Sequence, residues 1–303
     1  MNEKNETTKK KSGTVAILGK PNVGKSTLMN HFLGQKLSIV SSKPGTTRDK
    51  ISGILNHEKG QIVFLDTPGL HVPKLALGVH MVEEAQSSLG EADLIVLMTE
   101  ASSGFSGLDR DFIQSLKELT RPVLMVINKA DQVKKSRILP IMEEAIRMGF
   151  FKETIPVSCA THENLDALLD LIFKYLPEGE PYHTGDEISD RSERFFIAEM
   201  IREKALQNLD EEVPHSVAVL VDEMTEREGK NLWYIRAEIF VEKDSQKAIL
   251  IGKKGAMLKR IGETSRPDIE KMLSKKVFLE LWVKVLKNWR KDAKALKKLG
   301  IAM

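Results

Sequence analysis

The stretch GKPNVGKS, residues 19–26, decides the fold of the first half of this chain. It directly follows the apolar run 15–18 and precedes a segment of helical character, 26–33, which is the context that a phosphate-binding loop requires. Glycines let the backbone approach phosphate closely, and successive N–H groups with a helix N-terminus form a positive concavity. The predicted nucleotide contacts of this loop are Gly19, Lys20, Pro21, Asn22, Val23, Gly24, Lys25, Ser26 and Thr27.

A second motif, DTPG at residues 66–69, follows the next predicted strand, 62–65. We expect Lys25 to neutralise β- and γ-phosphate oxygens, Ser26 and Asp66 to hold Mg²⁺, and the N–H of Gly69 to meet the γ-phosphate. Lys25 and Gly69 are therefore also predicted to be catalytic. The remaining predicted nucleotide contacts of this loop are Thr67, Pro68 and Leu70.

Base choice is predicted from NKAD, residues 128–131, after the apolar run 123–127. The carboxylate of Asp131 can accept hydrogen bonds from N1–H and the exocyclic amine of guanine, whereas adenine offers no such donor pair. GTP is therefore expected over ATP, which argues against a small-molecule kinase. SCA, residues 158–160, would complete the guanine pocket, with Cys159 either a small apolar substitute or a redox-sensitive thiol. The predicted base contacts are Asn128, Lys129, Ala130, Asp131, Ser158, Cys159 and Ala160.

The polar stretch SSKPGTTRDK, residues 41–50, resembles the first switch of such proteins. A threonine hydroxyl there could reach Mg²⁺ only with the γ-phosphate present, which would couple nucleotide state to loop order. We favour Thr47 over Thr46 for this metal-binding and catalytic role. Arg48 is either a charge-stabilising finger or a surface or partner contact.

The whole chain, 303 residues, is long enough for two domains. Up to about residue 176, short apolar runs alternate with helical segments, which predicts a mostly parallel sheet with helices on both faces. We expect a disordered arm at 1–12, an α/β P-loop domain at 13–176, a linker at 177–192 and an α+β domain at 193–303.

The second domain is predicted to have the order α-β-β-α-α-β-α with a small sheet. Its expected elements are a helix at 194–209, strands at 216–226 and 231–242, helices at 245–251 and 256–273, a strand at 277–285 and a basic helix at 287–299. The glycines of IGKKG, residues 251–255, let the backbone approach a sugar-phosphate chain, which is typical of a KH domain. The segment from Gln246 onward carries 16 Lys and Arg against five Asp and Glu, so it favours RNA. Trp282 and Trp289 are either base-stacking or core residues.

These motifs, with SDRSERFFIAEMIREKAL at 189–206, SQKAILIGKKGAMLKRIG at 245–262 and KVFLELWVKVLKNWR at 276–290, resemble the Era family of bacterial GTPases over nearly the whole chain. The resemblance implies a GTPase domain followed by a type II KH domain that binds the 3′ region of small-subunit (16S) ribosomal RNA and acts in small-subunit assembly. The departures are Gly45, where glutamine is frequent, and Cys159, where alanine is usual. The implied RNA-binding residues are Ile251, Gly252, Lys253, Lys254, Gly255 and Lys259.

Leu70 stands where many related switches carry a water-orienting glutamine, so slow hydrolysis is expected. Three agents could assist: His71, a partner's arginine, or a K⁺ ion held with the help of Asn22 beside the phosphates. The sequence resembles potassium-stimulated GTPases in having this asparagine and a hydrophobic residue after DTPG.

The single cysteine fits a reducing compartment and the apolar runs are too short to cross a bilayer, so a cytoplasmic protein is expected. We also expect it to be monomeric. An alternative role is membrane-surface regulation, because the basic helix expected at 287–299 could lie on anionic lipid. A peripheral membrane fraction on the cytoplasmic side is compatible with either role.

Overall fold

The computed structural model describes residues 10–41, 43, 45–69, 75–116, 119–185, 187–227 and 231–301. The chain forms two compact units. The first contains Met1–Leu37, Lys50–His71 and Val82–Asp190, and the second contains Ser38–Asp49, Val72–Met81 and Arg191–Met303. Two short segments from the first hundred residues therefore belong with the C-terminal part of the chain, which the predicted succession of domains did not anticipate.

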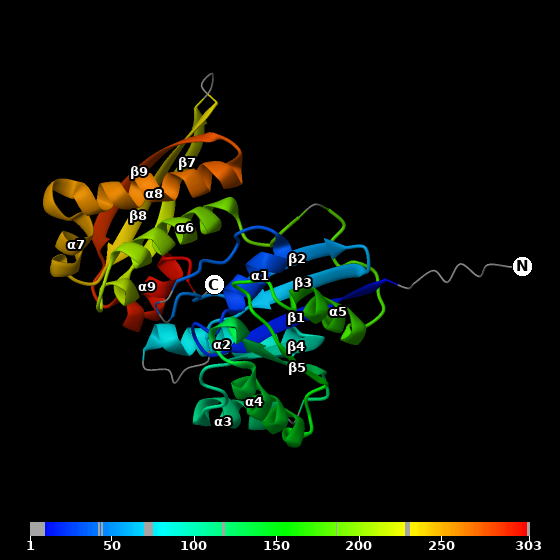
Figure 1. Ribbon diagram of the computed structural model, residues 1–303. Coiled ribbons are helices and arrows are strands. Elements are labelled where there is room, and N and C mark those ends of the chain that lie inside the picture. The colour runs from blue at the N-terminus through cyan, green and yellow to red at the C-terminus, as the bar shows by residue number, and fades with distance from the viewer. Residues whose placement is uncertain are drawn as a thin grey trace, which may run out of the picture. The chain divides into compact units, whose positions relative to one another are not determined.

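The first unit is built on a six-stranded sheet of order β2-β3-β1-β4-β5-β6 (Figure 1). Its strands are β1 (Lys11–Gly19), β2 (Ile51–His57), β3 (Gly60–Asp66), β4 (Leu94–Glu100), β5 (Val123–Asn128) and β6 (Glu153–Pro156). All pairs are parallel except β2 with β3. The predicted, mostly parallel sheet is confirmed. The antiparallel edge strand β2 was not among the predicted strands.

Helices cover both faces of this sheet, as predicted: α1 and α5 lie on one side and α3 and α4 on the other (Figure 1). The helices are α1 (Lys25–Leu33), α2 (Ala76–Glu91), α3 (Gly107–Leu116), α4 (Lys135–Met148) and α5 (Leu165–Tyr175), with a 3₁₀ turn η1 at Ala130–Gln132. Both faces are needed because β4 and β5 are almost entirely buried. The carboxyl ends of β1, β3 and β5 thereby bring the phosphate loop, DTPG and NKAD to one edge of the sheet.

The boundaries of the first unit differ from the predicted ones. Residues 1–9 of the expected arm lie outside the described part of the chain. Lys11 and Ser12 of β1 already pair with Gly60 and Gln61 of β3, so the sheet begins two residues before the predicted domain start at residue 13. The described residues of the expected linker, 177–192, form no helix or longer strand, as predicted. They are nevertheless held to the sheet, because the N–H of Ile54 donates to the carbonyl of Ile188.

The second unit contains a three-stranded sheet of order β7-β8-β9. Its elements are α6 (Glu193–Asn208), η2 (Pro214–Ser216), β7 (Ala218–Arg227), β8 (Leu232–Val241), α7 (Asp244–Ile251), η3 (Lys253–Gly255), α8 (Ala256–Leu273), β9 (Lys276–Val285), η4 (Trp289–Lys291) and α9 (Ala293–Lys298). Alternate residues of the strands pack with the helices in one core that includes Ile201, Ile235, Ile261 and Val283. The predicted α-β-β-α-α-β order of a KH domain is confirmed.

The C-terminal tail differs from the predicted single basic helix at 287–299. It forms the short turn η4 and the six-residue helix α9. Asp292 caps this helix, because its side chain accepts a hydrogen bond from the N–H of Lys294. Trp289, Leu296 and Leu299 are buried in a cluster that also contains Leu77 and Met81 of α2. The expected helix fails because burial of Trp289 turns the chain at this point. Within the described residues, no helix has the length and apolar character needed to cross a membrane.

Candidate functional site

The phosphate loop joins β1 to α1 and surrounds the side chain of Lys25. The ammonium group of Lys25 donates to the carbonyls of Gly19 and Lys20 at 3.1 and 2.9 Å. Burial lowers the pKa of Lys25 from 10.5 to about 8, although the charge of Asp66 opposes this shift. An anionic ligand beside this ammonium group would stabilise its charge, so the loop can bind phosphate strongly.

The DTPG motif lies directly against the phosphate loop. The hydroxyl of Ser26 donates to a carboxylate oxygen of Asp66 at 2.6 Å, and the hydroxyl of Thr67 donates to the carbonyl of Ile17 at 2.8 Å. Gly69 approaches Pro21 so closely that an added Cβ would lie 2.5 Å from the nitrogen of Pro21. A hydroxyl and a carboxylate in contact are the hard oxygen ligands that Mg²⁺ prefers, so Ser26 and Asp66 fit a magnesium site completed by phosphate oxygens and water.

NKAD and SCA are held together by Asn128. Its amide donates to the carbonyl of Val23 at 2.7 Å and accepts from the N–H of Cys159 at 3.0 Å. The N–H of Ala130 donates to the carbonyl of Val157, and Lys129 pairs with Glu100. Among the described residues, the carboxylate of Asp131 makes no such hydrogen bond or ion pair. Asp131 is exposed at the edge of this loop. Asn128 therefore builds the loop, and Asp131 is left to face a ligand.

Cys159 is buried within the SCA loop, with 6% of its surface exposed. Burial raises the pKa of the Cys159 thiol to about 12, despite a hydrogen bond with Asn128 that acts in the opposite direction. A protonated, buried thiol is a poor nucleophile. The geometry therefore favours the small apolar substitute over the redox-sensitive thiol.

The predicted first switch, 41–50, lies in the second unit except for Lys50, and segment 38–49 packs on α6 and η2. The N–H of Val40 donates to the carboxylate of Glu203 at 3.0 Å, and Arg202 donates to the carbonyl of Thr46. The Thr46 hydroxyl donates to the carbonyl of Lys43 at 2.6 Å, whereas Thr47 is half-buried. Arg48 is 4% exposed, so the expectation that it is a surface residue is wrong.

Two residues in the hydrolysis argument, Leu70 and His71, lie outside the described residues. The predictions about them stay predictions. Asn22 is described: it lies in the phosphate-loop turn with a positive φ of 64° and an exposed side chain.

The GKKG loop forms the η3 turn between α7 and α8. Gly252 has a φ of 73°, and an added Cβ would lie 2.8 Å from Cβ of Met257, so only glycine fits. Lys253 and Lys254 are exposed, as is Lys259 one turn into α8, whereas Ile251 is partly covered. The loop therefore presents backbone and two ammonium groups to solvent, as an RNA-binding KH loop must.

Sequence reasoning missed Ile249, whose surface is 51% exposed on α7 two residues before Ile251. An exposed isoleucine beside a basic loop can contact a base, and its only sequence signal was an apolar residue in a short helix. Trp282 is 54% exposed on β9, whereas Trp289 is fully buried and donates from its indole N–H to the carbonyl of Ser216. The core alternative is thus correct for Trp289 and wrong for Trp282.

Comparison with known proteins agrees with this geometry. A family model described as "50S ribosome-binding GTPase" matches residues 14–129, and a model described as "KH domain" matches residues 212–290. A solved structure of Era in complex with MgGDPNP and nucleotides 1506–1542 of 16S ribosomal RNA is 44% identical, with a TM-score of 0.94, and covers 97% of this chain and 100% of its own. The chain belongs to the Era family of GTPases.

A second structure gives the same values: a single-residue variant of Aquifex aeolicus Era bound to GDP and AlF₄⁻, again 44% identical with a TM-score of 0.94, covering 97% of this chain and 100% of its own. The Era match extends across both compact units, so the expectations of a P-loop GTPase and of a following KH domain are both confirmed. As an Era-family GTPase, the protein hydrolyses GTP to GDP and phosphate.

Proposed function

We propose that this Era-family protein is a GTP-dependent switch that binds the 3′ region of 16S ribosomal RNA through its KH domain and acts in assembly of the small ribosomal subunit. The observation that carries the proposal is the full-length similarity to an Era structure that contains a GTP analogue and that RNA. The test is crosslinking in cells followed by sequencing of the bound RNA. Enrichment of the 16S 3′ region supports the proposal, and enrichment of unrelated RNA contradicts it.

In the proposed nucleotide site, Lys25 contacts the β- and γ-phosphates, and Ser26, Asp66 and Thr47 hold Mg²⁺. The contact of Ser26 with Asp66 and the local use of the Thr46 hydroxyl support this assignment of the metal ligands. Bound Mg²⁺ would supply charge neutralisation at the phosphates. Asp131 selects guanine, Gly69 donates its N–H to the γ-phosphate, and Asn128 braces the base loop.

We also propose slow hydrolysis that K⁺ accelerates, with Asn22 as a protein ligand of that ion. The support is its place in the phosphate loop and a non-glutamine residue at position 70. Single-turnover hydrolysis at constant ionic strength should be faster in K⁺ than in Na⁺ for the wild type but not for Asn22→Ala. Equal wild-type rates in both salts would reject the ion, and a rate collapse of His71→Ala in K⁺ would favour His71.

The proposed RNA site consists of the GKKG loop with Lys259, extended by Ile249. The protein is proposed to act as a cytoplasmic monomer, which light scattering of the purified chain would test. The structure does not favour the membrane-surface alternative, because the apolar residues of the tail, Trp289, Leu296 and Leu299, are buried within the second unit. Liposome flotation beside RNA filter binding would separate these roles.

A further inference from the structure

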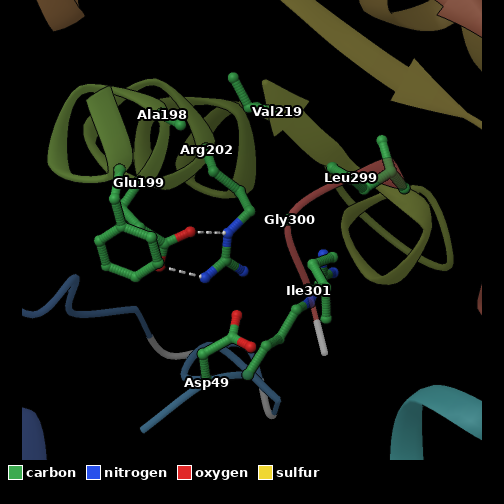
Figure 2. Close-up of a pocket in the computed structure, with 11 residues that line it drawn as sticks. Asp49, Ala198, Glu199, Arg202, Val219, Leu299, Gly300 and Ile301 are labelled. Carbon is green, nitrogen blue, oxygen red and sulfur yellow. Dashed lines mark hydrogen bonds and ion pairs between the residues drawn. The ribbon is translucent and has the colours of Figure 1, made fainter. Parts of the chain in front are cut away.

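A small cavity of about 40 Å³ lies within the second unit beside two buried arginines (Figure 2). Arg48 comes from segment 38–49 and Arg202 from α6, and they are 4% and 2% exposed. Figure 2 shows Arg202 joined to Glu199 on one wall, Asp49 on another, and Leu299 to Ile301 along a third. The cavity therefore brings together residues that are distant in the sequence.

The charges around this cavity are paired unequally. Arg202 donates to both carboxylate oxygens of Glu199, at 2.7 and 2.6 Å, and Asp49 contacts the imidazole of His80 at 2.9 Å. Arg48 instead donates to the carbonyls of Val217 and His215, at 2.7 and 3.4 Å, and lies 5.3 Å from the ring centre of Trp289. Within the described part of the chain, no carboxylate is hydrogen-bonded to Arg48.

Burial lowers the pKa of Arg48 to about 9, and the charge of Arg202 acts in the same direction. The charges of Glu199 and Asp49 oppose this shift, but neither carboxylate accepts a hydrogen bond from Arg48. The Nε of Arg48 and the Nη1 of Arg202 are buried donors that have no hydrogen-bond partner among the described residues. Buried donors without acceptors are costly. A single oxyanion in the cavity would accept hydrogen bonds from both donors.

The size of the cavity selects the class of anion. One water molecule needs roughly 10–15 Å³ of cavity volume, so this cavity has room for about three groups of that size. A carboxylate or a tetrahedral phosphate has two to four oxygens within such a volume. Guanidinium groups bind these oxyanions with short, charge-assisted hydrogen bonds.

We propose that this cavity binds one small oxyanion, phosphate or carboxylate, between the Nε of Arg48 and the Nη1 of Arg202. The bound anion connects segment 38–49 with α6 through ionic hydrogen bonds, so it strengthens the packing of this segment within the second unit. The phosphate loop, which lies in the first unit, is a separate anion site.

The test uses the full chain saturated with GDP and Mg²⁺, so that added anions do not report on the phosphate loop. Binding of inorganic phosphate is followed by ³¹P NMR and binding of formate by ¹³C NMR, at constant ionic strength. We expect saturable binding of one equivalent of at least one anion, weakened at least tenfold in Arg48→Met. Lys43→Met is the matched control, because Lys43 is in the same segment but pairs with the exposed Asp210 at 3.1 Å; its affinity should equal that of the wild type.

Binding of phosphate alone, formate alone or both supports the site and identifies its preferred anion. Saturable binding of neither anion to the wild type overturns the proposal and leaves the cavity to water, as does undiminished binding to Arg48→Met. Ala198 also lines the cavity, and Ala198→Leu fills the space while retaining both arginines. Binding that persists in Ala198→Leu overturns the proposal even if Arg48→Met does not fold.

Discussion

At the residue scale, Lys25 and Asp131 differ in burial and in charge, and these differences suit them to different parts of the nucleotide. The ammonium group of Lys25 donates to two loop carbonyls, and its burial lowers its pKa to about 8. Asp131 remains exposed beside a loop that Asn128 braces. The first residue is suited to phosphate and the second to the base.

Asp131→Asn should move base preference from GTP towards XTP, because an amide can donate to the carbonyl that replaces guanine's amine. Two charge-assisted hydrogen bonds contribute roughly 1.5–3 kcal/mol each, so at least a hundredfold loss of GTP affinity is expected. Competition binding of GTP against XTP measures the change. Glu163→Gln, which removes an exposed carboxylate from the neighbouring loop, is the control. A variant that still prefers GTP tenfold over XTP would contradict the role of Asp131.

Nucleotide affinity should depend on pH through Lys25. Its pKa in the free protein is about 8, and phosphate charges raise that pKa in the complex. The complex therefore binds the proton more tightly, so affinity is highest below pH 8 and falls above it by up to about tenfold per pH unit. Calorimetry of GDP binding at pH 8.5, in buffers of different ionisation enthalpy, should show proton uptake. Affinity that is constant from pH 7 to 9.5 would argue against this shift.

At the element scale, the α7–η3–α8 segment combines a backbone set by packing with exposed charges. Gly252 sets the turn because a side chain would collide with Met257, and the lysines that follow are exposed. Packing determines the backbone conformation of this segment, whereas its affinity for RNA is expected to depend on the charge of the two lysines.

Replacing Lys253 and Lys254 by Asp should weaken RNA binding severely while leaving GTP affinity near the wild-type value. Each lost phosphate contact should flatten the dependence of log K on log salt by roughly 0.7 for single-stranded RNA. Filter binding over a salt series measures both quantities. Lys297→Asp with Lys298→Asp makes the same charge change on exposed residues of α9 and should have the smaller effect. Equal losses in the two double variants would remove the GKKG loop from the binding site.

At the scale of the whole molecule, the two compact units do not follow the order of the chain. Segment 38–49 and the start of α2 complete the second unit, where Leu77 and Met81 pack with the tail around Trp289. The second unit therefore depends on residues that precede it by more than a hundred positions.

Trp289→Ala should lower the free energy of unfolding of the second unit by about 3–5 kcal/mol, because it leaves a cavity and an unpaired carbonyl at Ser216. Trp282→Ala, on an exposed residue, should change that free energy by no more than about 0.5 kcal/mol. Denaturant unfolding followed by circular dichroism compares them. A small effect of Trp289→Ala would contradict its place in the core, and weaker RNA binding by Trp282→Ala would indicate base stacking.

Local patterns predicted much of the fold and of the nucleotide site. The strand containing Val15–Leu18, the helix at 256–273 and the meeting of DTPG with GKPNVGKS follow from periodicity and spacing, because parallel strands place their carboxyl ends on one edge. The edge strand β2 was missed because a short apolar run with polar neighbours carries little periodic signal. The division of the expected helix at 287–299 into η4 and α9 was missed because the burial of Trp289 overrides helix propensity.

The sequence by itself determined the GTPase chemistry, the order of the KH elements and the family, because each rests on short motifs and periodic segments whose own residues are contiguous in the chain. Only the tertiary structure decided that Arg48 and Arg202 meet at a cavity, that Trp289 is buried while Trp282 is exposed, and that segment 38–49 belongs with the second unit. These features depend on contacts between residues more than a hundred positions apart, and burial at such contacts depends on the whole packing rather than on any local pattern.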